Sequence, residues 1–305
     1  MEIIYPLKRY VMELEIKNLT KQYSNGIIAL NNVNLTIGKG LFGLLGPNGA
    51  GKSSLMRTIA TLQYPTSGEI LFGGLDVLNN SKEIKKTLGY LPQEFGFYQK
   101  DRAIDLLNHF TLLKGVNNNG ERKNLVEYLL QKVNLWDARN QRIGTFSGGM
   151  KQRFGIAQAL VCDPKLIIVD EPTAGLDPFE RKRFHNLLSE ISEDVVIILS
   201  THIVDDVNNL CANMAIINKG EIILKQEPRK AIEFYNGKVW EKEVSKSDVD
   251  EFAKKHFVIS SRLFGGKNYL KVLSDTNPDD GFESVSPILE DVYFHTLLKH
   301  NQLNN

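Results

Sequence analysis

The chain has 305 residues, 42% of them hydrophobic and 24% charged, which is the composition of a globular protein with room for a sizeable core. Its 37 Lys and Arg residues nearly balance its 36 Asp and Glu residues, so no overall field favours nucleic acid or an anionic membrane as a partner. No apolar run reaches the roughly eighteen residues that span a bilayer, and we expect any membrane role to be peripheral.

The cysteines and the first residues suggest little special chemistry. Cys162 and Cys211 are too few for a disulfide framework and both lie beside apolar residues, so we expect reduced, buried thiols in a cytosolic protein. Met12 begins the first clean strand pattern. Residues 1–11 are therefore expected to be an extension, and the start is left open between Met1 and Met12.

Short strands come first along the chain. Residues 13–16 and 30–37 alternate apolar and polar side chains, and the turn residues 24–26 between them predict an antiparallel pair. Residues 68–74 form another short strand between turn glycines, and a third strand ends at residues 89–92. We expect an N-terminal antiparallel β part.

A helical pattern follows and then gives way to buried strands. Residues 101–142 carry apolar side chains at helical spacing on both sides of the polar loop 117–120, which predicts an inserted helical subdomain at about residues 95–145. The unbroken apolar runs 166–169 and 195–199 are typical of parallel strands buried on both faces. Because helical segments alternate with these runs, we predict an α/β core with a mostly parallel sheet.

The pattern weakens beyond about residue 236. It predicts a strand, a helix at 248–256, a hairpin across Gly265 and Gly266, and a last helix at 288–300. Gly265-Gly266-Lys267 lacks the first glycine and the hydroxyl residue of a phosphate loop, so we interpret it as a turn. We predict a main domain over residues 12–236 and a small C-terminal α/β domain over residues 237–305.

A phosphate-binding loop follows the apolar run 41–45. The template of a glycine, four free positions, a second glycine, a lysine and a hydroxyl residue is met by Gly46, Pro47, Asn48, Gly49, Ala50, Gly51, Lys52 and Ser53. Glycines let backbone N–H groups surround the phosphates, and the helix predicted after the loop directs its positive end at the anion. Lys52 is expected to contact the β- and γ-phosphates and Ser53 to bind Mg²⁺, with Ser54 also at the nucleotide. The loop predicts a P-loop NTPase core that binds ATP or GTP.

Carboxylates end the apolar strand at residues 166–169. Asp170 is expected to hold Mg²⁺, directly or through water, and Glu171 to orient or deprotonate the attacking water. An acidic strand end in solvent is the alternative. His202, at the end of the next apolar strand, is expected to contact the γ-phosphate or the water, and a structural histidine is its alternative.

A second glycine-rich turn lies in the segment 146–153. Ser147, Gly148 and Gly149 form a small polar turn at a predicted helix N-terminus, which is a second place that can hold a phosphate. Residues 146–153, followed by residues 171–178, resemble two motifs of the ATP-binding subunit of an ABC (ATP-binding cassette) transporter, in the order that this family shows. The resemblance covers about residues 12–226. It implies that Ser147, Gly148 and Gly149, here called the signature turn, grip the γ-phosphate bound to a partner subunit.

Other positions also resemble family residues. Gln93 resembles the glutamine that binds Mg²⁺ and water and senses the membrane partner. Tyr23 resembles the aromatic residue that stacks on adenine, with a core tyrosine at a strand end as the alternative. Asp177 resembles the residue that links the two sites across the dimer, and its other role is a helix N-cap before Pro178.

The sequence departs from the family pattern in two places. Phe146 stands where leucine is usual and Met150 where glutamine is usual, a variant of exporters of the ABC-2 type, so export is favoured. The aromatic side chains in residues 94–102 are expected either to dock a membrane subunit or to belong to the core of the helical subdomain.

The resemblance implies an ATPase that uses ATP and Mg²⁺, forms a homodimer or pairs with a second ATPase subunit, and drives a multi-span membrane permease by ATP-dependent closure. Such a subunit lies at the cytoplasmic face of the cell membrane, and we expect no nucleic-acid partner. The alternatives are a soluble ABC ATPase acting on ribosomes, DNA or proteins, and a module that binds ATP without hydrolysis. The C-terminal region is expected to have a packing role, with regulation, a wider dimer contact or binding of the membrane partner as alternatives.

Overall fold

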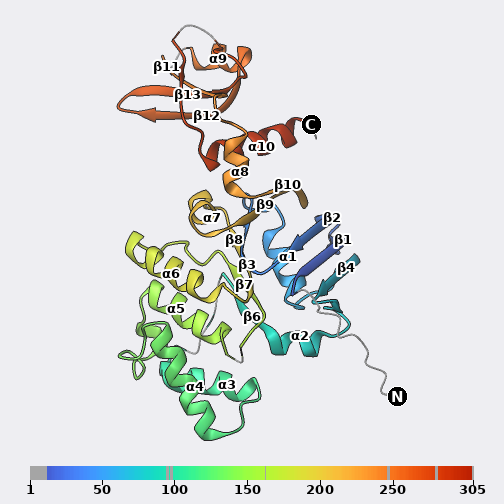
Figure 1. Ribbon diagram of the computed structural model, residues 1–305, viewed down its shortest axis with the longest axis vertical. Helices are drawn as coiled ribbons and strands as arrows, with labels where there is room; N and C mark the ends of the chain where they lie inside the picture. The colour runs from blue at the N-terminus through green and yellow to red at the C-terminus, as the bar shows by residue number, and fades with distance from the viewer. Residues whose placement is uncertain are drawn as a thin grey trace, which may run out of the picture.

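The computed structural model describes residues 12–93, 96, 99–161, 163–245, 248–278 and 281–303. Figure 1 shows the strands of a central sheet in the middle of the molecule, an antiparallel sheet beside them, a helical lobe at one end and a small β unit with α10 at the other. The predictions for Cys162 and for the aromatic side chains of Phe95, Phe97 and Tyr98 lie outside the described residues. Among the described residues, no helix is long and apolar enough to cross a membrane.

The N-terminal strands form an antiparallel sheet, as predicted. Its order is β2 (Ile28–Ile37), β1 (Leu14–Gln22), β4 (Ser67–Phe72) and β5 (Leu75–Asp76). Leu14 is opposite Ile37 on one side and Phe72 on the other, and all three side chains are buried. The alternation of apolar and polar residues thus directs one face of this sheet into the core.

The central sheet has the order β10 (Glu221–Gln226), β9 (Asn213–Asn218), β3 (Gly40–Leu45), β8 (Val196–Thr201), β7 (Leu166–Asp170) and β6 (Leu88–Leu91). Neighbouring strands from β9 to β6 are parallel, and only β10 is antiparallel to its neighbour. Every residue of β7 and β8 is buried, which confirms the prediction from their unbroken apolar runs. The carboxyl ends of the parallel strands meet at one edge, where loops gather side chains from distant parts of the chain.

Successive residues of the central strands supply two different apolar clusters. Phe42 and Leu44 face the antiparallel sheet and α1 (Lys52–Ile59) with α2 (Ser81–Thr87), whereas Leu41 and Leu45 belong to the cluster on the other face. That second cluster includes residues of α6 (Pro178–Ile191) and α7 (Val204–Leu210). The sheet is therefore covered on both faces, as a parallel sheet requires.

The helical lobe consists of α3 (Ala103–Leu113), α4 (Asn119–Lys132), the 3₁₀ turn η1 (Ile143–Thr145) and the start of α5 (Gly148–Ala159). The predicted polar loop 117–120 is confirmed only in part, because Asn119 and Gly120 already belong to α4. Asn118 caps that helix and accepts hydrogen bonds from the N–H groups of Gly120 and Glu121 at 2.9 and 3.1 Å. Phe146 is buried with its ring edge-on to that of Phe154 at 6.4 Å, so the departure from leucine fills the core of the lobe.

The C-terminal part begins after α8 (Pro228–Glu233). Its sheet has the order β12 (Phe257–Phe264), β13 (Lys267–Leu273), β11 (Val239–Val244) and β14 (Glu283–Ser284), with α9 (Val249–Lys255) and α10 (Leu289–Leu303). The predicted hairpin turn at Gly265 and Gly266 is confirmed, with φ of 58° and 80°. Helix α10 packs against α7, α8, β10 and β12, and therefore joins this part to the central core.

The C-terminal end of α10 contacts the end of β9, just before the β9–β10 turn. The side-chain amide of Asn218 shares a hydrogen bond with Nδ1 of His300 at 3.0 Å and donates one to Oδ1 of Asn301 at 3.1 Å. Two residues further along the chain from Asn218, the N–H of Gly220 donates to the carbonyl oxygen of Ala50 in the phosphate loop at 2.9 Å.

Cys211, directly after α7, is a free and buried cysteine, and burial raises the pKa of its thiol far above the usual range.

Candidate functional site

The phosphate loop joins β3 to α1 and is packed tightly against two other segments. A Cβ atom on Gly46 would lie 2.5 Å from the carbonyl oxygen of Ile217 in β9, and one on Gly51 would overlap the carbonyl oxygen of Ala29. Gly51 also has a φ of 109°, a conformation that favours glycine. Because both contacts are with backbone, a side chain at either position would displace the loop.

Lys52 is the first residue of α1, and its ammonium group lies inside the loop. Its Nζ donates to the carbonyl oxygens of Gly46 at 2.7 Å and Pro47 at 3.2 Å, and lies 3.2 Å from Oε1 of Glu171. The side chain is only 5% exposed, so these partners compensate for the desolvation of its charge. The loop lysine and the strand-end glutamate, distant in sequence, thus share one site.

Asp170 ends β7 beside Ser200 of β8, and only 3% of its surface is exposed. In the part of the chain that the structure describes, its Oδ1 accepts no hydrogen bond. Burial raises the pKa of Asp170 above its ordinary value, and the nearby hydroxyls of Ser200 and Ser53 and the charge of Lys52 oppose this only in part.

The surroundings of Asp170 fit a magnesium ion. A buried carboxylate oxygen that accepts no hydrogen bond from the described residues, close to a serine of the phosphate loop, is a donor set of the kind that a hard cation prefers. Among the described residues, no group of three or more His, Cys, Asp or Glu side chains forms a metal cage. Mg²⁺ is commonly held by one or two protein groups together with phosphates and water.

Glu171 follows Asp170 in a backbone conformation that few residues other than glycine adopt. Its φ is 48°, and its N–H donates to the carbonyl oxygen of Ser200 at 2.8 Å. Its Oε2 lies 2.7 Å from Nδ1 of His202, while Oε1 faces Lys52. Such a conformation costs on the order of 1 kcal/mol and is concentrated at functional sites. The carboxylate therefore links the predicted loop lysine to the predicted histidine, whose side chain is 44% exposed.

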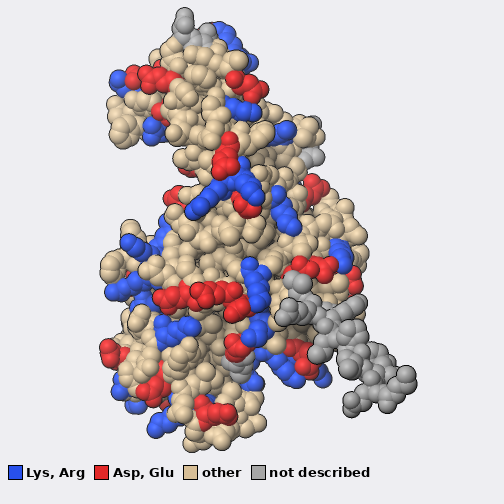
Figure 2. All heavy atoms as spheres, viewed as in Figure 1, with Lys and Arg blue, Asp and Glu red and all other residues tan. Residues whose placement is uncertain are grey.

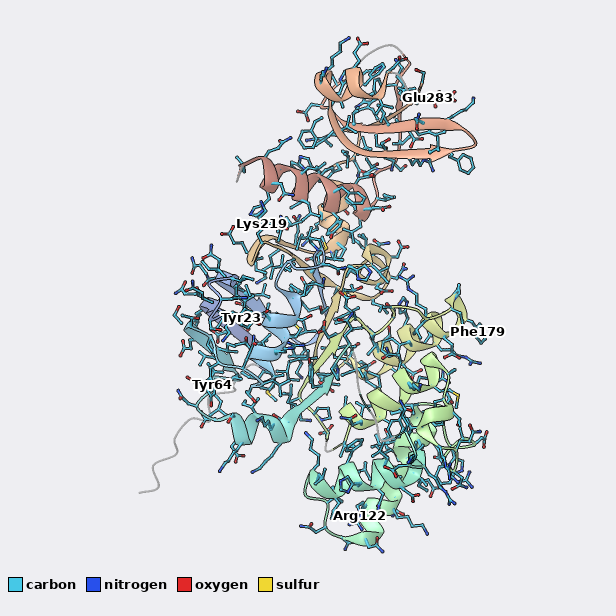
Figure 3. The ribbon with its side chains drawn as sticks, turned by 180° about the vertical axis from the view of Figure 1, so that it is seen from behind. Tyr23, Tyr64, Arg122, Phe179, Lys219 and Glu283 are labelled. Carbon is cyan, nitrogen blue, oxygen red and sulfur yellow. The ribbon has the colours of Figure 1, made fainter. Side chains whose placement is uncertain are left out.

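Gln93 and Tyr23 lie at the border of this site. Gln93 is exposed just beyond β6, whose parallel pairing aligns Leu91 with Val169 of β7. Tyr23 is half-buried, and its hydroxyl lies 3.0 Å from Oγ of Ser54 in the first turn of α1. Figure 3 shows Tyr23 among the N-terminal strands, on the side of the sheet that carries α1. The hydroxyl has a structural partner, and stacking of the ring on adenine stays a prediction.

The signature turn begins α5. Ser147 is the N-cap, and its Oγ accepts a hydrogen bond from the N–H of Met150 at 3.2 Å. Gly149 packs so closely on α6 that a Cβ atom would overlap the carboxylate of Glu180, which forms an ion pair with the buried side chain of Arg153. Ser147 and its neighbour Gly148 are exposed. The turn therefore presents backbone N–H groups and a hydroxyl outward.

Asp177 caps α6, the helix against which the signature turn packs. Its Oδ1 accepts hydrogen bonds from the N–H groups of Phe179 and Glu180, both at 2.9 Å. The predicted capping role is confirmed. Its role across a dimer stays a prediction.

A buried carboxylate that the sequence pattern does not mark joins several segments of the site. Asp206 in α7 is fully buried and accepts hydrogen bonds from Thr173, from Nε of Arg181 at 2.7 Å and from Nε2 of His185 at 2.8 Å. Burial alone would raise the pKa of Asp206, but the hydrogen bonds from His185, Thr173 and Arg181 outweigh it and hold the pKa below its ordinary value. The network joins the segment after Glu171 to α6 and α7. Nothing in the local pattern separates Asp206 from its exposed neighbour Asp205.

A phosphate loop on a central strand, with carboxylates at the end of a strand in the same parallel sheet, is the arrangement of P-loop nucleoside triphosphatases. Comparison with known proteins narrows this class. Residues 30–174 match the model of the ABC transporter family.

Curated relatives match most of the main domain. The ABC transporter ATP-binding protein NatA of Bacillus subtilis is 38% identical over 200 residues, which cover 65% of this chain and 81% of that protein. The lantibiotic transport ATP-binding protein SrtF of Streptococcus pyogenes is 38% identical over 70% of this chain and 90% of its own length. The bacitracin transport ATP-binding protein BcrA of Bacillus licheniformis is 34% identical over 72% of this chain and 74% of its own length.

Solved structures agree. The dimeric ATP-binding cassette MJ0796, bound to ADP and Pi, is 27% identical with a TM-score of 0.64 and covers 70% of this chain and 98% of that chain. The chain belongs to the ABC transporter family, and it is an ATP-binding subunit with ATPase activity. The family inferred from the signature turn and the phosphate loop is thereby confirmed, and the soluble alternative has no support from these relatives.

Proposed function

We propose that two copies of this chain close head to tail, with ATP held between the phosphate loop of one copy and the signature turn of the other. The observation that carries the proposal is the separation of these two phosphate-binding elements. Lys52, Glu171 and His202 converge on the loop, whereas Ser147 is exposed and hydrogen bonded only within α5 in the described part of the chain. One copy alone has half of the donors that a γ-phosphate needs, and a second copy supplies the rest.

The residues around the phosphate loop have different roles in this proposal. Asp170, Ser53 and Gln93 would hold Mg²⁺, which neutralises charge on the phosphates when it is bound. The backbone of the loop binds the phosphates, Tyr23 stacks on the base, and Ser54 supports that ring. Asp177 links the two sites across the dimer.

The ion pair between Lys52 and Glu171 gives the site a way to respond to ATP. A γ-phosphate competes with the carboxylate for the ammonium group, because both are anions within reach of the same Nζ. Glu171 released from Lys52 keeps its contact with His202 at 2.7 Å, which orients the carboxylate toward an attacking water. Binding of ATP thus prepares the base for hydrolysis.

We further propose that the dimer powers export through a separate membrane subunit and lies with it at the cytoplasmic face of the membrane. Export is supported by the variant signature turn with Phe146 and Met150, and by the bacitracin and lantibiotic transport proteins among its relatives. The docking surface is a groove of about 720 Å³ between the core and α3. Leu62 and Leu113 on its walls are 58% and 69% exposed.

Basic side chains at the edge of this groove favour an acidic partner. Lys82, Lys85 and Lys86 of α2 border it beside the apolar walls. A cytoplasmic helix of the membrane subunit with one apolar face and acidic flanks is complementary to such a surface. Figure 2 shows acidic and basic side chains interspersed over the visible face of the molecule.

The test of the ATP site uses two substitutions and a control. Lys52→Ala is expected to weaken ATP binding at least tenfold, because a buried charge contact to the phosphates is lost. Lys39→Ala, just before β3, removes an exposed lysine that forms an ion pair with Asp194 and should leave ATP binding unchanged. Glu171→Gln should bind ATP, lose turnover and accumulate as a dimer in sedimentation experiments. A Glu171→Gln protein that stays monomeric with ATP contradicts the proposal.

The membrane partner is tested by co-purification from detergent-solubilised membranes. A multi-span protein that elutes with the ATPase, and is lost when Leu62 and Leu113 are both changed to Asp, supports docking at the groove. A ribosome or nucleic acid in its place contradicts the transport role.

A further inference from the structure

A pocket beside the phosphate loop brings the C-terminal helix into the neighbourhood of the ATP site. Its volume is about 460 Å³. Residues from three parts of the chain line it: Pro47 and Asn48 of the loop, the segment His202, Ile203, Val204 and Asp205, and the side chains Glu290, Tyr293 and Phe294 of α10. Pro47 and Asn48 belong both to the phosphate loop and to this pocket. A group that enters the pocket therefore contacts the ATP site and α10 at the same time.

An aromatic side chain stands exposed on another part of the same chain. Phe179, in the first turn of α6, is 65% exposed, and the guanidinium of Arg183 lies 4.3 Å from the centre of its ring. Figure 3 shows Phe179 on α6, on the opposite side of the ribbon from Tyr23. A large exposed aromatic ring backed by an arginine is typical of an anchor residue at a protein interface.

Phe179 is physically tied to the signature turn. Asp177 caps α6 through the N–H of Phe179 itself, and Gly149 of the turn packs on Glu180 one residue later. The signature turn and the start of α6 are therefore packed together into one surface. If the turn of one copy lies over the phosphate loop of the other, the start of α6 must lie beside that loop as well.

The pocket and α6 also carry opposite charges. Asp205 and Glu290 are exposed at the pocket, and the described part of the chain gives neither of them an ion pair. Lys182, next to Phe179 on α6, is exposed and has no ion pair among the described residues either. Asp205 also lines a second cavity against α6, so the pocket and α6 lie on one continuous surface, as a two-fold symmetric contact requires.

We propose that Phe179 of each copy enters the pocket of the other copy, between the phosphate loop, α7 and α10, when the dimer closes on ATP. This inference rests on the head-to-tail dimer of the proposed function and makes the C-terminal helix part of its interface. The occupant is a second copy of this chain. Phe179 adjoins the signature turn and the pocket adjoins the phosphate loop, and in the proposed dimer these two elements meet between copies. Each dimer contains the contact twice.

The test measures dimer formation in the Glu171→Gln protein with ATP and Mg²⁺ by analytical ultracentrifugation. Phe179→Ala in this background is expected to weaken the dimer at least tenfold, because an aromatic anchor is lost at two symmetric positions. Binding of a fluorescent ATP analogue by the monomer should not change, since Phe179 lies outside the phosphate loop. Phe234→Ala is the matched control: that ring is 67% exposed with the ammonium group of Lys238 4.4 Å from its centre, but it directly follows α8 and not the signature turn.

A cross-link identifies the position of the contact. A Glu171→Gln chain carrying Lys182→Cys and Glu290→Cys, both exposed positions, keeps the Phe179 ring and should form a covalent dimer under mild oxidation with copper phenanthroline only when ATP is present. A disulfide within one chain leaves a monomer, and that result counts against the proposal.

The outcomes separate this inference from the function on which it rests. A Glu171→Gln dimer that is unaffected by Phe179→Ala, with no ATP-dependent cross-link, overturns the inference and leaves the ATP sandwich intact. Absence of any dimer in the parent Glu171→Gln protein overturns both.

Discussion

Replacing Asp170 with Asn is expected to make the protein without nucleotide more stable while removing its response to Mg²⁺ and ATP. The carboxylate is 3% exposed, and its Oδ1 has no hydrogen-bond partner in the described part of the chain. A buried polar group left without a partner costs roughly 1–3 kcal/mol, and more when it is charged. The neutral amide keeps the shape and loses the charge, so we expect a gain of about 1 kcal/mol.

This gain has a defined dependence on pH. Burial raises the pKa of Asp170, so the folded state binds the proton more tightly than the unfolded state does. The cost of the ionised carboxylate is therefore present at neutral pH and disappears as the pH falls toward the ordinary carboxyl range near about 4. The stability difference between Asp170→Asn and the parent protein should narrow in the same direction.

Melting temperatures measure both effects. Without nucleotide at neutral pH, Asp170→Asn should melt about 2 °C higher than the parent protein. With saturating ATP and Mg²⁺ the order should reverse, because the parent protein gains binding free energy that the variant lacks. Asp194→Asn is the control, because the pKa shift of Asp194 has the opposite sign: Lys39 lowers the pKa of this exposed carboxyl. Removing its charge should therefore not raise the melting temperature. A lower melting temperature for Asp170→Asn without nucleotide would refute the reasoning.

Two further substitutions test the frame around the site. Gly46→Ala should lower the melting temperature and abolish ATP binding, because its Cβ would lie 2.5 Å from the backbone oxygen of Ile217, whereas Gly38→Ala meets open space and should do neither. Calorimetry and ATP titration check both variants, and an intact ATP site in Gly46→Ala would show that the loop can shift. Asp206→Asn should lower the free energy of unfolding in urea by about 3 kcal/mol, because donors around a buried carboxylate lose their partner. Since the pKa of Asp206 is lowered, this contribution is present above the ordinary carboxyl range and is lost as the pH falls through the lowered pKa, so the variant should show a weaker pH dependence below about pH 4.

The parts of the site that depend on local templates were predictable from the sequence. The phosphate loop needs its glycines and Lys52 within a few residues of one another, and the parallel strands that bring Glu171 to it read as unbroken apolar runs. The polar loop before α4 and the Gly265-Gly266 turn likewise carry their own conformational preferences.

Features that depend on distant partners were not predictable. Asp205 and Asp206 are chemically identical neighbours, and only the packing of α7 against α6 buries one and exposes the other. The positive φ of Glu171 has no local signal either, since glutamate does not favour it and the carbonyl oxygen that accepts its N–H belongs to Ser200 on another strand. The approach of α10 to Asn48 depends in the same way on the tertiary fold.

The contacts of α10 with the β9–β10 turn have a practical consequence for work on this protein. His300 and Asn301 bind Asn218, and Gly220 in the same turn donates to Ala50 of the phosphate loop. A short chain of hydrogen bonds thus connects the last turn of α10 to the phosphate loop. Trimming the chain before His300, or fusing a rigid tag directly after α10, should register as a change in nucleotide affinity, and assays of ATP binding should compare tags at both ends of the chain.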